Sequence, residues 1–453
     1  MNNCYASIEM LHHPKLRGHP VAVGGSVESR HGIILARNYE ARPFGVKVGQ
    51  ALWEARRKCP DLIIVPPDYD KYLRYSRLFR GILSDYSPQV EPFGLDESWV
   101  DVSKYSGGVG GTGGVDRIGG GAGAGGVGVD RSGGGDESGA VGGGGFGCGG
   151  CVDCSGGIVS GANIADEIRR RVKEELGVTV SVGVSWNKIF AKLGSDIKKP
   201  DATTVISESN YREVVWPLPA ADLLGVGGAT KAKLAKYGIE TIGDIANCDP
   251  GLLKGWFGKW GLFLYSYANG MDSSPVMIAG DENVIKSVGN SSTCPRDLEN
   301  DEDAHIVFQN LAESVAERMR ELGLQARTVE ISLRRNDLSG FIRQRTLERP
   351  THISTEICEA AMDLLRANYD WELPLRSIGV RGTNLVPICS MRQLSLFVDD
   401  ARRDKAERLE HTIDTIRRRY GHYAIDRALL RLDDKLGKLN PKDEHTIHPI
   451  GYL

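Results

Sequence analysis

Between residues 285 and 386 the hydrophobic pattern indicates six elements, in an order that few folds accommodate. A strand pattern (VIKSVGNSS) precedes a helix pattern (EDAHIVFQNLAESVAERMRELG), and a hairpin follows (RTVEISLRRND and GFIRQRTLERP). A second helix (STEICEAAMDLLRANY) and a final strand (LRSIGVRGTNLV) complete the series. The order β-α-β-β-α-β is that of a split βαβ unit of ferredoxin-like type. We therefore predict a ferredoxin-like domain over residues 285–390.

The remainder of the chain is too long for one core, because 453 residues normally divide into three or four domains. Residues 210–271 have the pattern of short helices joined by glycine turns. Residues 107–161 contain 27 of the 57 glycines and an imperfect repeat, VDRIGGG and VDRSGGG. Such a segment cannot bury enough apolar surface to offset the entropy of ordering it. It predicts a flexible surface insertion inside a strand–helix connection.

Composition excludes several classes of protein. There is no run of 18 apolar residues that could span a membrane, and the N-terminus does not resemble a signal peptide. Nine scattered cysteines fit a reducing cytosol, so we expect a cytoplasmic protein. A net charge of −3 is low for a nucleic-acid-binding protein, so the position of the arginines matters more than their number.

Cysteine and histidine clusters are weak evidence for a metal here. CGGCVDC places Cys148, Cys151 and Cys154 in the glycine-rich insertion, and no fourth ligand has a recognisable spacing. We interpret this cluster, and His445 with His448 near the C-terminus, as chance groupings, with metal binding the less favoured alternative.

Residues 93–102, FGLDESWVDV, place Asp96 and Glu97 inside an otherwise apolar run that predicts a strand covered on both faces. Ionised carboxylates in such a place need a partner. Mg²⁺ takes one or two carboxylates together with substrate phosphates, and a pair of such ions can assist phosphoryl transfer. The alternative is an acidic pair held by backbone or salt-bridge contacts, and the pair taken alone fits that alternative better.

Two other segments carry groups suited to a triphosphate. NYEARPFGVKVG places Tyr39 and Arg42 three residues apart, on one face if the segment is helical, and Arg42 could form two hydrogen bonds to a phosphate. Lys192 and Lys199 lie seven residues apart, so both could face one anion from a helix. Read singly, each pair also fits an ordinary solvated helix face.

Nucleic-acid contacts are predicted in two places. The glycine turn LLGVGGATKAKL leads into a helix whose first N–H groups could hold a phosphate. In the later hairpin Val329, Ile331 and Leu333 point one way, which leaves a polar face that arginines make basic. Such a face suits a duplex backbone, although a solvated surface is the alternative. The residues involved are Gly225, Gly227 and Lys231 in the turn, and Arg334, Arg335, Arg343, Arg345, Arg376 and Arg381 on the sheet.

Taken in order, these motifs resemble the DinB-type members of the Y family of lesion-bypass DNA polymerases. The resemblance runs through NCYASIE, ILARNYEARPFGVKVG, FGLDESWVDV, SVGVSWNKIFAKLGSDIKKP, GVGGATKAKL and KSVGNSSTCPRDL. It implies an α+β multidomain, right-hand polymerase of low fidelity, which adds dNTPs to a primer 3′ end with two Mg²⁺ ions. The implied divisions are a palm (1–4 and 70–206), fingers (5–69), a helical thumb with a helix-hairpin-helix (207–275), a linker (276–284), a ferredoxin-like little finger (285–390) and a tail (391–453).

The resemblance also implies roles for individual residues. Asp96 and Glu97 match the metal-binding aspartate and the catalytic glutamate, and the backbone carbonyl of Met1 should face them. Tyr5 matches the aromatic gate that leaves no room for a 2′-hydroxyl. Tyr39, Arg42 and Lys199 match triphosphate contacts. QLSLF resembles the bacterial sliding-clamp-binding peptide, with the residues Gln393, Leu394, Leu396 and Phe397, and we expect a bacterial monomer that binds primer–template DNA.

One feature departs from the family. An aspartate at the end of the first palm strand should directly precede the residues that match Met1–Tyr5, and the sequence as given begins after it. Glu9 lies too far along the chain to replace it. We expect a start codon assigned at an internal methionine, and a genuine truncation would bind Mg²⁺ poorly. The alternative function is therefore a catalytically impaired, clamp-tethered DNA-binding protein.

Overall fold

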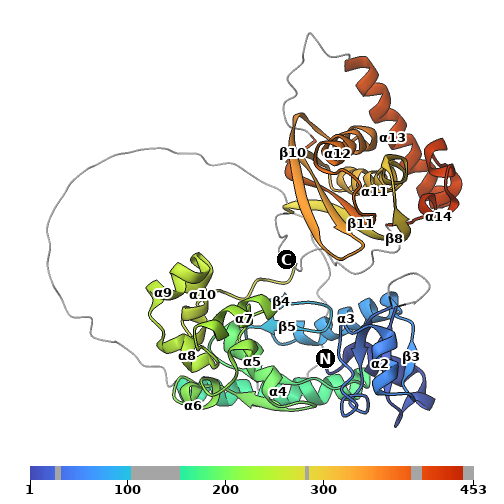
Figure 1. The fold of residues 1–453 in the computed structure, drawn as a ribbon. Helices are drawn as coiled ribbons and strands as arrows, with labels where there is room; N and C mark the ends of the chain where they lie inside the picture. Colours follow the sequence, from blue (N-terminus) through green and yellow to red (C-terminus); the bar gives the residue numbers. More distant parts are fainter. Residues whose placement is uncertain (26–31, 104–153, 281–284, 389–399, 442–453) are drawn as a thin grey trace, which may run out of the picture.

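The computed structural model describes residues 1–25, 32–103, 154–280, 285–388 and 400–441 (Figure 1). Its N-terminal elements are α1 (Cys4–His12), the 3₁₀ turn η1 (Pro14–Leu16), α2 (Leu52–Lys58) and a three-stranded sheet in the order β2-β1-β3. The strands are β1 (Val21–Gly24), β2 (Ile34–Arg37) and β3 (Ile63–Val65). Ala22, Ile34, Val46 and Leu52 form a small core of their own between this sheet and α2.

The next module joins α3 (Tyr69–Ser84) and α4 (Cys154–Leu176) to two separate pairs of strands. β4 (Val90–Pro92) and β5 (Ser98–Val100) are antiparallel, whereas β6 (Val182–Val184) and β7 (Thr203–Val205) are parallel, with α5 (Lys188–Ile197) between them in sequence. Tyr72 and Phe79 of α3 pack with Val172 of α4 in the core. α4 begins at Cys154, so the last residues of the predicted flexible insertion belong to a helix instead.

The prediction of one continuous strand over residues 93–102 is wrong. Residues 93–97 form the turn of the β4–β5 hairpin, closed by a hydrogen bond of 2.9 Å from Phe93 N to Glu97 O. Gly94 has a φ of +102°, a value that side chains other than glycine rarely adopt, and it allows the chain to reverse. Asp96 and Glu97 therefore project from a turn, not from within a strand.

A helical module follows, as the glycine-punctuated sequence predicts. Its elements are α6 (Tyr211–Val215), η2 (Ala220–Asp222), α7 (Gly228–Lys236), α8 (Ile242–Asn247), α9 (Pro250–Phe257) and α10 (Lys259–Ala268). Leu223, Leu234, Ile242, Leu253 and Leu264 are almost completely buried at its centre. Gly225 is required before α7, because its φ is +88° and a Cβ there would lie 2.3 Å from Trp260.

The predicted β-α-β-β-α-β unit is confirmed. Its elements are β8 (Ser287–Leu298), α11 (Asp301–Glu321), β9 (Leu324–Arg335), β10 (Gly340–Thr351), α12 (Ser354–Asn368) and β11 (Leu375–Pro387). The antiparallel sheet has the order β10-β9-β11-β8, so one strand separates the two strands of each βαβ crossover. Both helices cover the same face of the sheet, and no helix of the described residues covers the other face (Figure 1).

The chain returns to this unit after residue 400. α13 (Asp400–Tyr420) lies on the outer side of α11 and α12, where Arg320 of α11 contacts Asp414 at 2.6 Å and Arg403 contacts Glu356 of α12 at 2.9 Å. The elements beyond it are η3 (His422–Ala424), η4 (Ala428–Arg431) and α14 (Asp434–Gly437). Leu430, Leu436 and Leu439 join the core of the sheet and helices, so residues 400–441 extend this module.

Within the described ranges, no helix combines the length and the apolar character that crossing a bilayer requires.

Candidate active site

The two adjacent carboxylates line a cavity of about 1050 Å³. The β4–β5 turn that carries them is fixed on two sides. Phe93 packs on Trp99 with their ring centroids 4.7 Å apart, and the indole Nε1 of Trp99 donates a hydrogen bond of 2.9 Å to the carbonyl of Lys188 at the start of α5. The position of Asp96 and Glu97 is thus set by an aromatic pair and a helix N-terminus.

Glu97 has a direct basic partner. Lys192 Nζ lies 2.9 Å from Glu97 Oε1 and 2.9 Å from Asp196 Oδ2, while Lys199 Nζ lies 2.6 Å from Asp196 Oδ1. Burial alone would lower the pKa of Lys192, but the Glu97 and Asp196 carboxylates hold that pKa above its ordinary value. The ammonium group is therefore retained beside the carboxylate pair.

The expectation that Lys192 and Lys199 share one helix is wrong. α5 ends at Ile197, Lys198 is extended, and Pro200 disfavours the helical conformation of the residue before it. The two lysines nevertheless meet at Asp196, because Lys199 approaches from the segment that follows the helix.

The first residues of the chain connect the carboxylate turn with the neighbouring strands. The Met1 amino group donates to the backbone carbonyl of Asp96, and Asn2 N donates to Thr179 O at 2.8 Å. In the described part of the chain β5 pairs only with β4 and β6 only with β7, and the cavity is lined by Val100 and Val182 from the two pairs.

Glu9 lies away from the carboxylate turn and is occupied by other partners. Its side chain is 2% exposed and accepts hydrogen bonds from Lys71 Nζ at 3.0 Å and from Tyr72 Oη at 2.8 Å. These contacts hold α1 against α3 and use both oxygens of the carboxylate.

Tyr5 lies in the first turn of α1 and is fixed by two other tyrosines. Its ring stacks on Tyr72 with centroids 4.1 Å apart and planes 7° from parallel, and the edge of Tyr69 approaches at 6.2 Å. Burial, with a smaller contribution from the negative charge of Asp96, raises the pKa of Tyr5 above its ordinary value. The hydroxyl is therefore neutral, and the ring is held rigidly near the carboxylate turn.

Tyr39 and Arg42 are brought together, although by a turn and not by the predicted helix. Arg42 N donates to Tyr39 O at 3.1 Å, which curls the segment so that the guanidinium lies 4.1 Å above the centre of the Tyr39 ring. Arg42 Nη2 also donates to Asn3 Oδ1 at 2.9 Å. The contact to Asn3 places Arg42 at the N-terminus of α1, two residues before Tyr5.

Arg37, which the sequence analysis missed, belongs to the same site. Its Nε and Nη1 atoms are buried and have no hydrogen-bond partner in the described structure, and the same holds for Tyr39 Oη and Asn3 Nδ2. Burial and the charge of Arg42 both lower the pKa of Arg37 from its ordinary value. Buried donors that lack acceptors mark a place for an anion. Arg37, Tyr39, Arg42 and Asn3 are called the phosphate cradle below.

The predicted thumb contacts lie on one exposed helix end. Gly227 is the N-cap of α7, and Lys231 N donates to Gly227 O at 2.8 Å. Gly227 and Lys231 are exposed, so the first N–H groups of α7 are accessible to a phosphate.

The prediction that the sheet arginines form one basic face is wrong for three of them. Arg343 pairs with Ile331 and Arg345 with Val329, so both point to the helix-covered side of the edge strand β10. Arg343 donates to Asn368 at 3.0 Å and Arg345 contacts Asp363 at 2.8 Å, both on α12. Arg335 likewise turns to the helix side, where it lies 5.7 Å from the centre of the Tyr369 ring.

Arg334 and Arg381 remain on the uncovered face. Arg381 pairs with Glu330 in register, and the charged groups lie 3.5 Å apart. Arg376 lies at the irregular step of β11 between Leu375 and Ser377. The centre of this face consists of small residues, namely Gly289, Ser291, Ser332 and Gly379, which makes it flat.

The predicted clamp-binding residues Gln393, Leu394, Leu396 and Phe397 lie outside the described residues. So do Cys148, Cys151, His445 and His448.

Comparison with known proteins matches three parts of the chain to family models. Residues 1–196 match the impB/mucB/samB family, residues 285–396 match the C-terminal domain of that family, and residues 221–272 match the thumb domain described for DNA polymerase-iota. The chain is 44% identical to DNA polymerase IV of Acetivibrio thermocellus over 97% of its own length and 98% of that protein. It is 34% identical to DNA polymerase IV of Moorella thermoacetica, covering 94% of each chain.

Solved structures have the same fold. A Y-family DNA polymerase chimera of Dbh and Dpo4 superposes with a TM-score of 0.66 at 21% identity, covering 85% of this chain and 97% of the chimera. An insertion ternary complex of Dbh DNA polymerase gives a TM-score of 0.52 at 20% identity, with the same coverage. The expected right-hand α+β architecture is thus confirmed, and the chain belongs to the DNA polymerase IV (DinB-type) family of Y-family DNA polymerases.

Proposed function

We propose that the chain is a DNA-directed DNA polymerase of the translesion type, which extends a primer 3′ end with deoxynucleotides. One observation supports this most directly. The first five residues connect three groups of different chemistry: Met1 contacts Asp96, and Asn3 contacts Arg42 of the phosphate cradle. Tyr5 follows in the same segment, where its ring stacks on Tyr72. A nucleotide in this place would meet carboxylates, cationic donors and an aromatic ring together.

The carboxylates suit divalent metal ions of the magnesium type. Asp96 and Glu97 supply hard oxygen ligands, the carbonyl of Met1 is a third candidate, and Mg²⁺ commonly completes its shell with substrate phosphates and water. When bound, two such ions would supply charge stabilisation for the attacking and leaving oxygens of the phosphoryl transfer. Lys192 balances the charge of Glu97 at 2.9 Å when no substrate is present.

The other side chains of the site would bind and select the nucleotide. The triphosphate would accept hydrogen bonds from Arg37, Arg42 and Tyr39. Lys199 would add a positive charge from the segment that follows α5. The stacked ring of Tyr5 would lie beneath the sugar, where a rigid six-membered ring leaves no room for a 2′-hydroxyl. These roles concern binding and selection and leave the chemistry to the metal site.

Duplex DNA would be held by two surfaces that do not depend on base sequence. The exposed N-terminus of α7 would bind a backbone phosphate through Gly227 and Lys231. The flat face of the β8–β11 sheet, with Arg334 and Arg381, would lie along the duplex. QLSLF would attach the polymerase to the sliding clamp. We further propose that the protein is a monomer in the bacterial cytoplasm.

Primer extension by the 453-residue chain tests this proposal against the non-catalytic alternative. A labelled primer on an undamaged template and on a template with a lesion should be extended in the presence of dNTPs and Mg²⁺, and chelation of the metal should stop extension. Binding of the same DNA without extension under any divalent metal would support the clamp-tethered DNA-binding protein. The relatives that match over nearly their whole length are named DNA polymerase IV, which favours the polymerase over the non-catalytic alternative.

A further inference from the structure

Three side chains of the types that bind metals converge in the C-terminal module, outside the candidate active site. His352 lies between β10 and α12, and Glu407 and His411 lie one helical turn apart on α13, so the two helix residues share a face. A ligand atom of each residue lies within 4.8 Å of a ligand atom of the other two. In the described part of the chain, this is the one group of three or more His, Cys, Asp or Glu residues that meets so closely.

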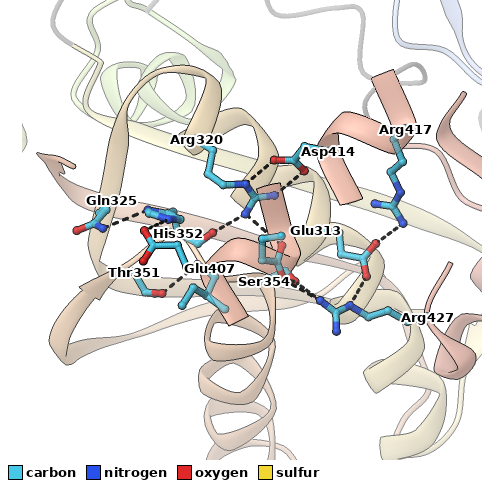
Figure 2. Close-up of polar contacts among 12 residues, drawn as sticks. Glu313, Arg320, Gln325, Thr351, His352, Ser354, Glu407, Asp414, Arg417 and Arg427 are labelled. Atoms are coloured by element: carbon cyan, nitrogen blue, oxygen red, sulfur yellow. Dashed lines mark hydrogen bonds and ion pairs between the residues drawn. The ribbon is translucent and has the colours of Figure 1, made fainter. Parts of the chain in front are cut away.

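His352 is the anchor of the group, and it is already oriented. The residue is 1% exposed, and its Nδ1 lies 3.1 Å from Gln325 Nε2, which fixes the ring plane (Figure 2). Histidines that bind metals are normally held in this way through the second ring nitrogen. The Gln325 amide can serve Nδ1 in either orientation, since its oxygen and nitrogen can exchange places.

The other ring nitrogen of His352 is left for a ligand. Nε2 lies 2.9 Å from Glu407 Oε1, yet the two atoms are not aligned for a hydrogen bond, and Nε2 is buried without any hydrogen-bond partner in the described structure. Figure 2 shows the Glu407 carboxylate and the His352 ring pointing toward each other.

The nearby positive charges are already neutralised. Arg320 contacts Asp414 at 2.6 Å and Glu410 at 3.1 Å, and Arg403 contacts Glu356 at 2.9 Å. Glu407 takes part in neither pair. The group therefore offers two imidazoles and one carboxylate to a cation without an uncompensated arginine beside it.

We propose that His352 Nε2, Glu407 and His411 bind a Zn²⁺ ion, with water in the fourth position. Two imidazoles and one carboxylate form a ligand set that Zn²⁺ uses in proteins, and Co²⁺ occupies such sites as a spectroscopic substitute. Because the ligands come from α13 and from the β10–α12 junction, the ion would fasten α13 to the sheet-and-helix core. The proposal does not depend on polymerase activity.

Co²⁺ and Zn²⁺ titration of the full chain tests the site. The cysteines of CGGCVDC could bind the same ions, so the protein carries Cys148→Ser, Cys151→Ser and Cys154→Ser. With excess Mg²⁺ present to occupy the Asp96–Glu97 site, this background should bind one equivalent of Co²⁺ with visible d–d absorption but no thiolate-to-cobalt charge-transfer band. Zn²⁺ should displace the Co²⁺ and raise the melting temperature.

Separate ligand variants decide the outcome. His411→Ala and Glu407→Gln, both on the accessible helix, should each lose the Co²⁺ spectrum and the Zn²⁺-dependent thermal shift, while His305→Ala on α11 should retain both. Circular dichroism of the metal-free variants shows whether they remain folded. Co²⁺ binding that survives His411→Ala, or that disappears when the three cysteines are replaced, would overturn the proposal.

Discussion

Lys192 Nζ and Glu97 Oε1 lie 2.9 Å apart, so α5 places a cation directly against the β4–β5 turn. The same ammonium group contacts Asp196 at 2.9 Å, so its positive charge is shared between the carboxylates of Glu97 and Asp196. A bound nucleotide and its metal ions would change this balance, because the triphosphate would compete for Lys192 while cations would compete for Glu97.

Replacement of this cation should weaken nucleotide use. Lys192→Met keeps most of the side-chain volume and removes the charge, and the loss of one charge-assisted hydrogen bond should reduce kcat/KM for dNTP by about 10- to 100-fold. Steady-state single-nucleotide insertion measures this effect. Lys15→Met, on the exposed turn η1, is the matched control and should leave kcat/KM unchanged. An unaltered kcat/KM in Lys192→Met would remove Lys192 from the site.

Loss of the Tyr5 ring should relax sugar selection. Tyr5→Ala removes the ring that stacks at 4.1 Å on Tyr72, and the space it leaves admits a 2′-hydroxyl. We expect the preference for dNTP over rNTP, measured as the ratio of kcat/KM values, to fall by about 10- to 200-fold, the range that steric discrimination of a small group provides. Tyr75→Ala on α3 is the control. Equal sugar preference in the Tyr5 variant and the wild type would show that the gate lies elsewhere.

Arg37 should bind the triphosphate and not the base or sugar. Its buried Nε and Nη1 donors lack acceptors in the described structure, so Arg37→Met should raise the Kd for dNTP by about 10- to 100-fold through loss of charge-assisted hydrogen bonds. Binding of a deoxynucleoside monophosphate should change little, because it lacks the outer phosphates. Arg56→Met on α2 is the control. A Kd for dNTP that stays at the wild-type value would contradict the cradle.

The contribution of Arg296 to stability should be lost in acid. Arg296 contacts Asp303 at 2.6 Å and Asp433 at 2.8 Å, joining β8, α11 and the N-cap of α14. Hydrogen bonds from Arg296 are the largest cause of the lowered pKa of both carboxyls, whose ordinary value is 3.8. The unfolded chain therefore binds more protons below pH 3.8, and the stabilisation present above that pH decreases as the pH falls.

Calorimetry of Arg296→Met across pH tests this coupling. The variant should melt at a lower temperature than the wild type at neutral pH, and the difference should shrink as the pH falls below 3.8. Arg74→Met, an exposed replacement on α3, should follow the wild-type curve. A difference between Arg296→Met and the wild type that stays constant down to strongly acidic pH would contradict the assigned pKa directions.

The fold of the C-terminal module was predictable because its periodicity is unambiguous, whereas the placement of its arginines was not. Alternation correctly assigned Val329, Ile331 and Leu333 to the core. It could not show that Arg343 pairs with Ile331, because that register depends on the geometry of the turn between β9 and β10. One residue of register decides which face a side chain occupies, and Arg343 and Arg345 were consequently assigned to the wrong face. Arg335 needed no register, because it lies two residues after Leu333 on the same strand and alternation already places it on the helix side.

In the candidate site, too, the sequence predicted some features and missed others. Local sequence identified Asp96, Glu97, Tyr39 and Arg42, but it described their backbone wrongly, since both segments are turns. Gly94 within FGLDESWVDV was the available signal for the hairpin. Arg37 carried no such signal, because an arginine at a strand end is ordinary until packing shows that its donors lack partners.

Single-turnover primer extension by Asp96→Ala is the most direct test of the central claim that the β4–β5 turn holds the catalytic metals. The wild-type chain and the control Asp85→Asn, which replaces an exposed carboxylate after α3, should extend a primer at the same rate with Mg²⁺. Asp96→Ala should bind the same primer–template DNA with unchanged affinity and should not extend it. Extension by Asp96→Ala at the wild-type rate would contradict the assignment of this turn as the active site.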